Sequence, residues 1–110
     1  MSEPIPADIA PPAGTVTILF TDIEGSTALW EQDGARMSQA LAAHDAIARR
    51  AVESRRGTVV KSTGDGMHAV FEVAEDALAA TLDMQRALAD PVATGGISLR
   101  VRCGLHAGIV

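Results

Sequence analysis

Cysteine, lysine and long hydrophobic runs are scarce in this 110-residue sequence. The single cysteine, Cys103, cannot form an internal disulfide, and we expect it to be a small buried apolar side chain. No apolar run approaches the roughly 18 residues of a membrane-spanning helix. The N-terminus has no basic segment followed by an apolar stretch, so the sequence indicates no signal peptide. We therefore expect a cytoplasmic protein with no membrane insertion from this segment.

Positive charge is also limited, because 9 Lys and Arg residues stand against 14 Asp and Glu residues, giving a net charge of −5. This balance argues against a general binder of nucleic acids or anionic membranes, whose affinity depends on basic side chains. It does not exclude a nucleotide site, which needs only local positive charge and a metal ion. Lys61 is the one lysine beside eight arginines, and this makes a specific role for it worth testing.

The hydrophobic content of 47% and charged content of 21% are ordinary for one soluble globular domain. Four prolines fall within the first 14 residues, where large apolar residues are few. Residues 1–14 are therefore expected to form a disordered or extended arm, and residues 15–110 the domain.

Hydrophobic periodicity predicts four strands and three helices in the domain. In chain order we expect a strand at 16–20, a short helix at 26–32, a helix at 35–55, a strand at 58–63, a strand at 67–71, a helix at 75–89 and a strand at 97–106. The order β-α-α-β-β-α-β is that of an α+β, ferredoxin-like split βαβ core, with an antiparallel sheet and helices on one face. In this topology the first and third strands pair near the centre of the sheet.

Finer expectations concern the helices. We expect Leu29 and Trp30 to face inward, and Gly57 to end the second helix as its left-handed residue. The apolar side of the third helix is expected to hold Ala74, Leu78, Leu82, Gln85 and either Leu88 or Ala89. His44, His68 and His106 are expected to be structural histidines rather than metal ligands.

Asp22 is placed where a buried strand ends and a helix begins. Gly25-Ser26-Thr27 follows as a helix-opening signal, with Ser26 or Thr27 available as the N-cap. Free amides and the helix dipole attract phosphate at such a point, and a carboxylate there would oppose an anion unless a cation lay between them. Asp22 is therefore a candidate ligand for a divalent metal ion that also meets phosphates.

A second carboxylate, Asp65, lies in the predicted turn Gly64-Asp65-Gly66, where glycines on both sides give the backbone freedom. The predicted topology brings this turn to the same sheet edge as Asp22. Two carboxylates beside a helix N-terminus form a plausible two-metal site for phosphate chemistry. Taken without further information, two solvated turn acids are the commoner arrangement.

Three segments together carry a family resemblance: F-T-D-I-E-G-S-T at 20–27, K-S-T-G-D-G at 61–66 and G-L-H-A-G at 104–108. They closely resemble the class III adenylate/guanylate cyclase catalytic domain of the bacterial type, over residues 15 to 110 and covering its N-terminal portion. Diguanylate cyclases share the split βαβ core, but their Gly-Gly-acid-acid-Phe hairpin is absent here.

The resemblance implies two metal ions, Mg²⁺ or Mn²⁺, held by Asp22 and Asp65 with the backbone carbonyl of Ile23 as a further ligand. It implies that ATP, or with less support GTP, is converted to a 3′,5′-cyclic nucleotide and pyrophosphate. Lys61 matches the residue that reads the purine base, against the alternative of a solvated strand end. Glu24 is expected to supply charge at the helix start rather than to bind metal. The resemblance also implies that the backbone amides from Ile23 to Thr27 bind the triphosphate. The further substrate-binding positions are Glu24, Gly25, Ser26, Thr27 and Gly64.

The resemblance also implies a site shared between two cyclase domains, in a homodimer or with another cyclase-domain partner. A complete family domain continues for roughly half as much again, and its second base-reading residue, Asn and Arg have no counterpart here. Two interpretations follow: a cyclase domain represented by its N-terminal part and inactive by itself, or an inactive nucleotide- and metal-binding or heterodimerising module. The downstream DNA distinguishes them, because an in-frame Asn-x-x-x-Arg pattern favours the first and a stop codon the second.

Overall fold

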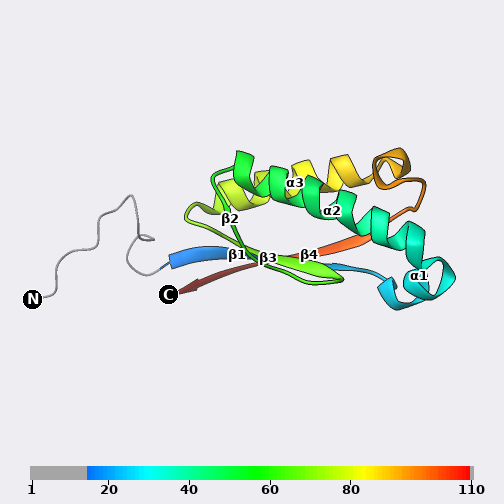
Figure 1. The fold of residues 1–110 in the computed structure, drawn as a ribbon. Coiled ribbons are helices and arrows are strands. Elements are labelled where there is room, and N and C mark those ends of the chain that lie inside the picture. Colours follow the sequence, from blue (N-terminus) through cyan, green and yellow to red (C-terminus); the bar gives the residue numbers. More distant parts are fainter. Residues whose placement is uncertain (1–14, 110) are drawn as a thin grey trace, which may run out of the picture.

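The computed structural model describes residues 15–109, so the arm expected at 1–14 lies outside the described residues. Figure 1 shows a four-stranded sheet with helices packed on one of its faces. The elements in chain order are β1 (Thr15–Ile23), α1 (Ser26–Gln32), α2 (Gly34–Ser54), β2 (Thr58–Ser62), β3 (Gly66–Phe71), α3 (Ala74–Leu88), the 3-10 helix η1 (Pro91–Thr94) and β4 (Val101–Ile109). No helix among these residues is both long and apolar enough to cross a membrane.

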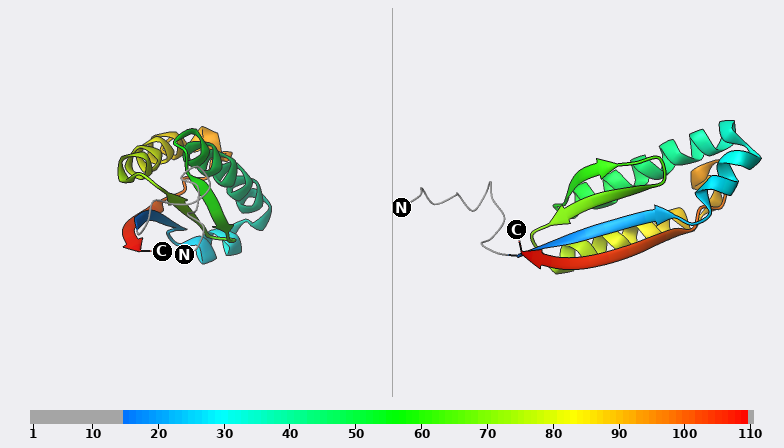
Figure 2. Two further views of the ribbon diagram at one scale, coloured as in Figure 1. Left: turned by 90° about the vertical axis from the view of Figure 1, so that its left-hand side faces the viewer. Right: turned by 90° about the horizontal axis from the view of Figure 1, so that it is seen from below.

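The sheet has the strand order β2-β3-β1-β4, and every neighbouring pair is antiparallel. The predicted ferredoxin-like core is confirmed, including the pairing of the first and third strands at the centre. Figure 2 (right), seen from below, looks onto the sheet face that α2 and α3 leave uncovered. The sheet therefore has one face in the core and one face open.

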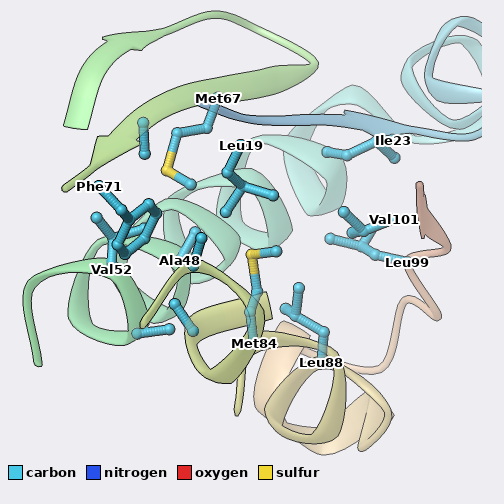
Figure 3. Close-up of a cluster of buried hydrophobic side chains, with 14 of the residues drawn as sticks. Leu19, Ile23, Ala48, Val52, Met67, Phe71, Met84, Leu88, Leu99 and Val101 are labelled. Carbon is cyan, nitrogen blue, oxygen red and sulfur yellow. The ribbon is translucent and has the colours of Figure 1, made fainter. Parts of the chain in front are cut away.

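Alternation along β1 separates these two faces. Leu19 and Ile23 are 0% and 3% exposed and point into the hydrophobic cluster beneath the helices. Successive residues of a strand point to opposite faces, so Phe20 points the other way, and it is 40% exposed on the open face. Figure 3 shows Leu19 and Ile23 packed with Met84 and Val101 in this cluster. Because Asp22 follows the same alternation as Phe20, it belongs to the open face.

The end of α2 differs from the sequence prediction. Arg56, not Gly57, adopts the left-handed conformation, with φ 62°. The Arg56 guanidinium donates to both carboxylate oxygens of Asp76 at 3.1 and 2.6 Å, which ties this corner to α3. Gly57 is required for another reason, since a Cβ there would lie 2.4 Å from the buried ring of Phe71. Gly57 therefore leaves room for the Phe71 ring and does not provide the left-handed residue that ends the helix.

The predicted apolar side of α3 was right at Leu88, which is buried, and wrong at Leu78 and Leu82. Leu78 and Leu82 are 51% and 45% exposed, and small residues face the sheet instead. The buried positions of α3 are Ala77, Ala80, Met84 and Leu88. Alanines allow the helix to lie close to the strands, so the larger leucines are turned to its outer side.

Two further expectations also failed in part. Leu29 packs against the core, but Trp30 is 37% exposed rather than inward-facing. The last strand begins at Val101 instead of residue 97, because β1 ends at Ile23, the partner of Val101. Residues 97–100 therefore have no strand to pair with, and η1 precedes them.

The single cysteine is half-buried rather than fully buried. Cys103 Sγ accepts a hydrogen bond from Gln85 Nε2 at 3.2 Å, and burial raises the pKa of the Cys103 thiol. His44 is fully buried within the α2 stripe, as the sequence predicts, and its Nδ1 lies 3.0 Å from the Asp45 carboxylate.

Gly57→Ala should lower the free energy of unfolding by about 1–3 kcal/mol, because the new methyl group overpacks the Phe71 ring. Gly34→Ala is the matched control, since a Cβ at Gly34 meets nothing within 4 Å at the start of α2. Urea denaturation of both variants measures the difference. Equal stability of the two would show that the Phe71 contact does not determine the need for glycine.

Candidate metal and nucleotide site

The end of β1 and the β2–β3 turn bring the two candidate acids to one place. Asp22 pairs with Gly66 in the β1–β3 register, and the amide of Ile23 donates to the carbonyl oxygen of Asp65 at 2.7 Å. Asp22 and Asp65 therefore sit on adjacent strand ends, although they are far apart in the sequence. The turn itself is closed by a hydrogen bond from the Thr63 amide to the Gly66 carbonyl at 2.9 Å.

Gly66 makes this approach possible by a mechanism that the sequence did not indicate. We expected the glycines of the turn to supply backbone freedom, but neither Gly64 nor Gly66 has a positive φ. A Cβ on Gly66 would instead lie 2.1 Å from the carbonyl oxygen of Thr21. Any side chain at Gly66 would push β3 away from β1 where the acids meet. A Cβ on Gly64 would meet nothing within 4 Å, so packing does not restrict that position.

The Asp65 carboxylate is exposed and is held by its own turn. The Thr63 hydroxyl donates to Asp65 Oδ1 at 2.9 Å. Among residues 15–109, no cationic side chain is paired with Asp65. Its second oxygen and its negative charge are therefore available to a cation from solution.

The Asp22 carboxylate has a partner that the sequence analysis did not single out. Arg102 of β4 donates from Nε to Oδ1 at 2.8 Å and from Nη2 to Oδ2 at 2.9 Å. These hydrogen bonds, together with the charge of Asp22, raise the pKa of the Arg102 guanidinium above its ordinary value. The sequence placed Arg102 at a polar position of the last predicted strand, but only the β1–β4 register of the structure makes Asp22 its partner.

Lys61 lies on the same open face, farther from the acids. It pairs with His68 in the β2–β3 register, and His68 pairs with Phe20 in the β1–β3 register. The His68 and Phe20 rings meet edge to face with their centroids 4.9 Å apart. Lys61 is exposed and separated from β1 by one strand, a spacing of about 10 Å.

An open pocket of about 360 Å³ lies beside Asp22 and the Phe20–His68 pair, and neither Asp65 nor Lys61 lines it. The aromatic pair forms one part of its wall, and the Asp22–Arg102 ion pair forms another. Its lining residues are Phe20, Thr21, Asp22, His68, Arg102, Cys103 and Gly104. The pocket thus combines a flat apolar wall with one negative and one positive side chain.

The start of α1 differs in detail from the expected cap. Gly25 is the N-cap, with a left-handed φ of 68°, and neither Ser26 nor Thr27 occupies that position. The Glu24 amide donates to the Arg100 carbonyl at 2.7 Å, and the Ile23 amide is bound to Asp65. In the described part of the chain, the amides of Gly25, Ser26 and Thr27 have no such backbone acceptor.

The donor set suits a hard divalent ion only in part. Within residues 15–109, no group of three or more His, Cys, Asp or Glu side chains is gathered for a metal. A pair of carboxylates still fits Mg²⁺ or Mn²⁺, because Mg²⁺ is commonly bound through one or two carboxylates, with phosphate oxygens and water completing its shell. Glu24 is exposed beside this pair.

Comparison with known proteins places these observations in a family. The sequence model of the adenylate and guanylate cyclase catalytic domain matches residues 9–110. An uncharacterized protein of Mycobacterium tuberculosis is 39% identical over 102 residues, covering 91% of this chain and 33% of that protein. The adenylate cyclase of Lachancea kluyveri is 41% identical over 78 residues, covering 71% of this chain and 4% of that protein.

The fold agrees with the sequence match. A solved adenylate cyclase structure from Trypanosoma brucei, in its monomeric state, has a TM-score of 0.76 and 27% sequence identity, covering 94% of this chain and 62% of that one. The chain spans about a third of the length of its mycobacterial relatives. The match to the family model and the similarity of the fold show that the chain belongs to the adenylate and guanylate cyclase catalytic domain family.

Proposed function

We propose that this chain is part of a nucleotidyl cyclase that converts ATP, or less readily GTP, to a 3′,5′-cyclic nucleotide and pyrophosphate for cyclic-nucleotide signalling. The observation that carries the proposal is the meeting of Asp22 and Asp65 at adjacent strand ends, fixed by the Ile23–Asp65 backbone hydrogen bond. In this reaction the ribose 3′-oxygen attacks the α-phosphate and pyrophosphate leaves. A cytoplasmic location follows from the same proposal, since the substrate is there.

Asp22 and Asp65 would hold the metal ions, Mg²⁺ or Mn²⁺, with the Ile23 carbonyl as a further ligand. Bound there, the ions would lower the pKa of the 3′-hydroxyl and neutralise charge on the phosphate oxygens. The free amides of Gly25, Ser26 and Thr27 would face the triphosphate at the start of α1. Lys61 would donate to the edge of the purine base from β2.

A partner domain completes the proposed site. Asp22, Lys61 and the pocket lie on the open face of the sheet, and Asp65 is exposed in the turn at its edge. Figure 2 shows that α2 and α3 leave this face uncovered. The transition-state Asn and Arg of the family have no counterpart among the 110 residues. We propose a homodimer, or pairing with a second cyclase domain, as the assembly in which the reaction takes place.

Replacing both acids, in Asp22→Asn with Asp65→Asn, should weaken Mn²⁺ binding by more than about tenfold, since even outer-shell changes cost roughly 10–100-fold in metal affinity. Titration calorimetry of the 110-residue chain measures the affinity. The matched control is Glu31→Gln with Glu72→Gln, which removes the same charge from two exposed acids elsewhere. Equal affinity in the two double variants would eliminate the proposed metal site.

The purified 110-residue chain, given Mn²⁺ and ATP, should produce negligible cyclic AMP. Each transition-state donor of the type it lacks is worth about 100- to 1,000-fold in rate. Chromatographic detection of cyclic AMP over time measures turnover, with the Asp22→Asn and Asp65→Asn double variant as the background. Robust turnover above that background would show that residues within this chain supply the transition-state contacts.

In a full-length version of the protein, Lys61→Ala should reduce the ratio of ATP to GTP turnover more than it changes Mn²⁺ affinity, because Lys61 lies away from the acids on β2. Arg50→Ala, at an exposed position of α2, is the matched control for loss of one positive charge. Steady-state rates with each nucleotide give the ratio. An unchanged ratio in Lys61→Ala would assign base selection to other residues.

A further inference from the structure

The two acids of the site are in different electrostatic states. Both oxygens of Asp22 accept hydrogen bonds from the guanidinium of Arg102, at 2.8 and 2.9 Å. Within residues 15–109, the Asp65 carboxylate accepts a hydrogen bond only from the neutral Thr63 hydroxyl and has no cationic partner. A cation that approaches from solution therefore finds one free carboxylate and one that is already neutralised.

The geometry of the Arg102 contact matters as much as its charge. A guanidinium bound through two parallel N–H···O bonds uses one lone pair on each oxygen of Asp22 and occupies the side of the carboxylate where a bidentate divalent ion would bind. Metal and guanidinium therefore compete for this side of Asp22 and for its negative charge. The Arg102 side chain is 65% exposed and the Asp22 side chain 50% exposed, so Arg102 has solvent into which it can move.

We propose that Arg102 is a positioning residue that competes with the divalent cation for Asp22. The inference rests on the proposed metal site and adds an order to its assembly. The first ion binds through Asp65, and Asp22 joins the coordination shell only when the Arg102 fork opens. In the metal-free protein, Arg102 keeps Asp22 oriented on the open face and lowers the repulsion between the two acids.

Mn²⁺ binding to the 110-residue chain, followed by the electron paramagnetic resonance signal of free Mn²⁺, tests the competition. Arg102→Gln should tighten the dissociation constant roughly two- to fivefold, the range expected for losing one exposed ion pair. Arg102→Lys should bind with intermediate affinity, because lysine keeps the charge but cannot form the fork. Arg100→Gln is the matched control, since it removes the same charge two residues away without breaking a side-chain hydrogen bond of the described residues.

The outcomes separate this inference from the proposed function. Equal dissociation constants for Arg102→Gln and Arg100→Gln, or weaker binding in Arg102→Gln, would overturn the competition while leaving the metal site intact. Absence of Mn²⁺ binding in every variant and in the unaltered chain would overturn both. If Arg102→Gln does not fold, as judged by circular dichroism, the comparison of Arg102→Lys with the unaltered chain decides the question.

A metal-free measurement tests the ion pair directly. Thermal unfolding of Asp22→Asn, Arg102→Gln and the double variant forms a double-mutant cycle. We expect the two single changes to be non-additive, with the double variant unfolding at a higher temperature than their sum predicts. Strict additivity would show that the two side chains do not interact in solution and would overturn the inference.

Discussion

The close approach of β1 and β3 at Gly66 is the constraint on which the rest of the site depends. Gly66 is buried, and a Cβ there would meet the Thr21 carbonyl at 2.1 Å. The contact is made by backbone atoms, so it fixes the strand ends more rigidly than a contact between side chains would. This strand pairing and the backbone hydrogen bond between Ile23 and Asp65 determine the relative position of Asp22 and Asp65. The register of the sheet therefore determines where the two carboxylates of the site lie.

The negative charge of Asp22 is balanced by Arg102 of β4, the last strand of the described residues. Two carboxylates on neighbouring strand ends repel each other, and this repulsion grows as the surroundings become less polar. Arg102 reaches Asp22 because β4 pairs with β1 along its whole length, from the partner of Thr15 to the partner of Ile23. The fourth strand thus contributes to the site as well as to the sheet, since without it the acid pair would face solvent with no compensating charge.

The sequence was enough to predict the features that depend on periodicity. Its predictions failed for side chains whose orientation or role depends on contacts with residues far away in the sequence. Alternation along the strands and the order of elements were enough to predict the ferredoxin-like core and the adjacency of Asp22 and Asp65. The outward direction of Leu78 and Leu82 depends on how close α3 lies to the sheet, which helix periodicity does not encode. The role of Gly57 depends on Phe71, and the Asp22–Arg102 pair depends on the β1–β4 register. Each of these features can be recognised only when the position of the contacting residue in the folded chain is known.

The asymmetry of the sheet gives a physical reason for a partner surface. The helices cover one face of the sheet (Figure 2), while Asp22, Lys61 and the pocket lie on the other. Phosphoryl chemistry benefits from the exclusion of water, because electrostatic interactions strengthen as the local dielectric falls. In the described residues Asp65 and Lys61 are exposed, and Asp22 is half-exposed, so this side of the sheet cannot exclude water by itself. In the proposed dimer, the edge-to-face Phe20–His68 pair is the aromatic surface on this face that the second domain would cover.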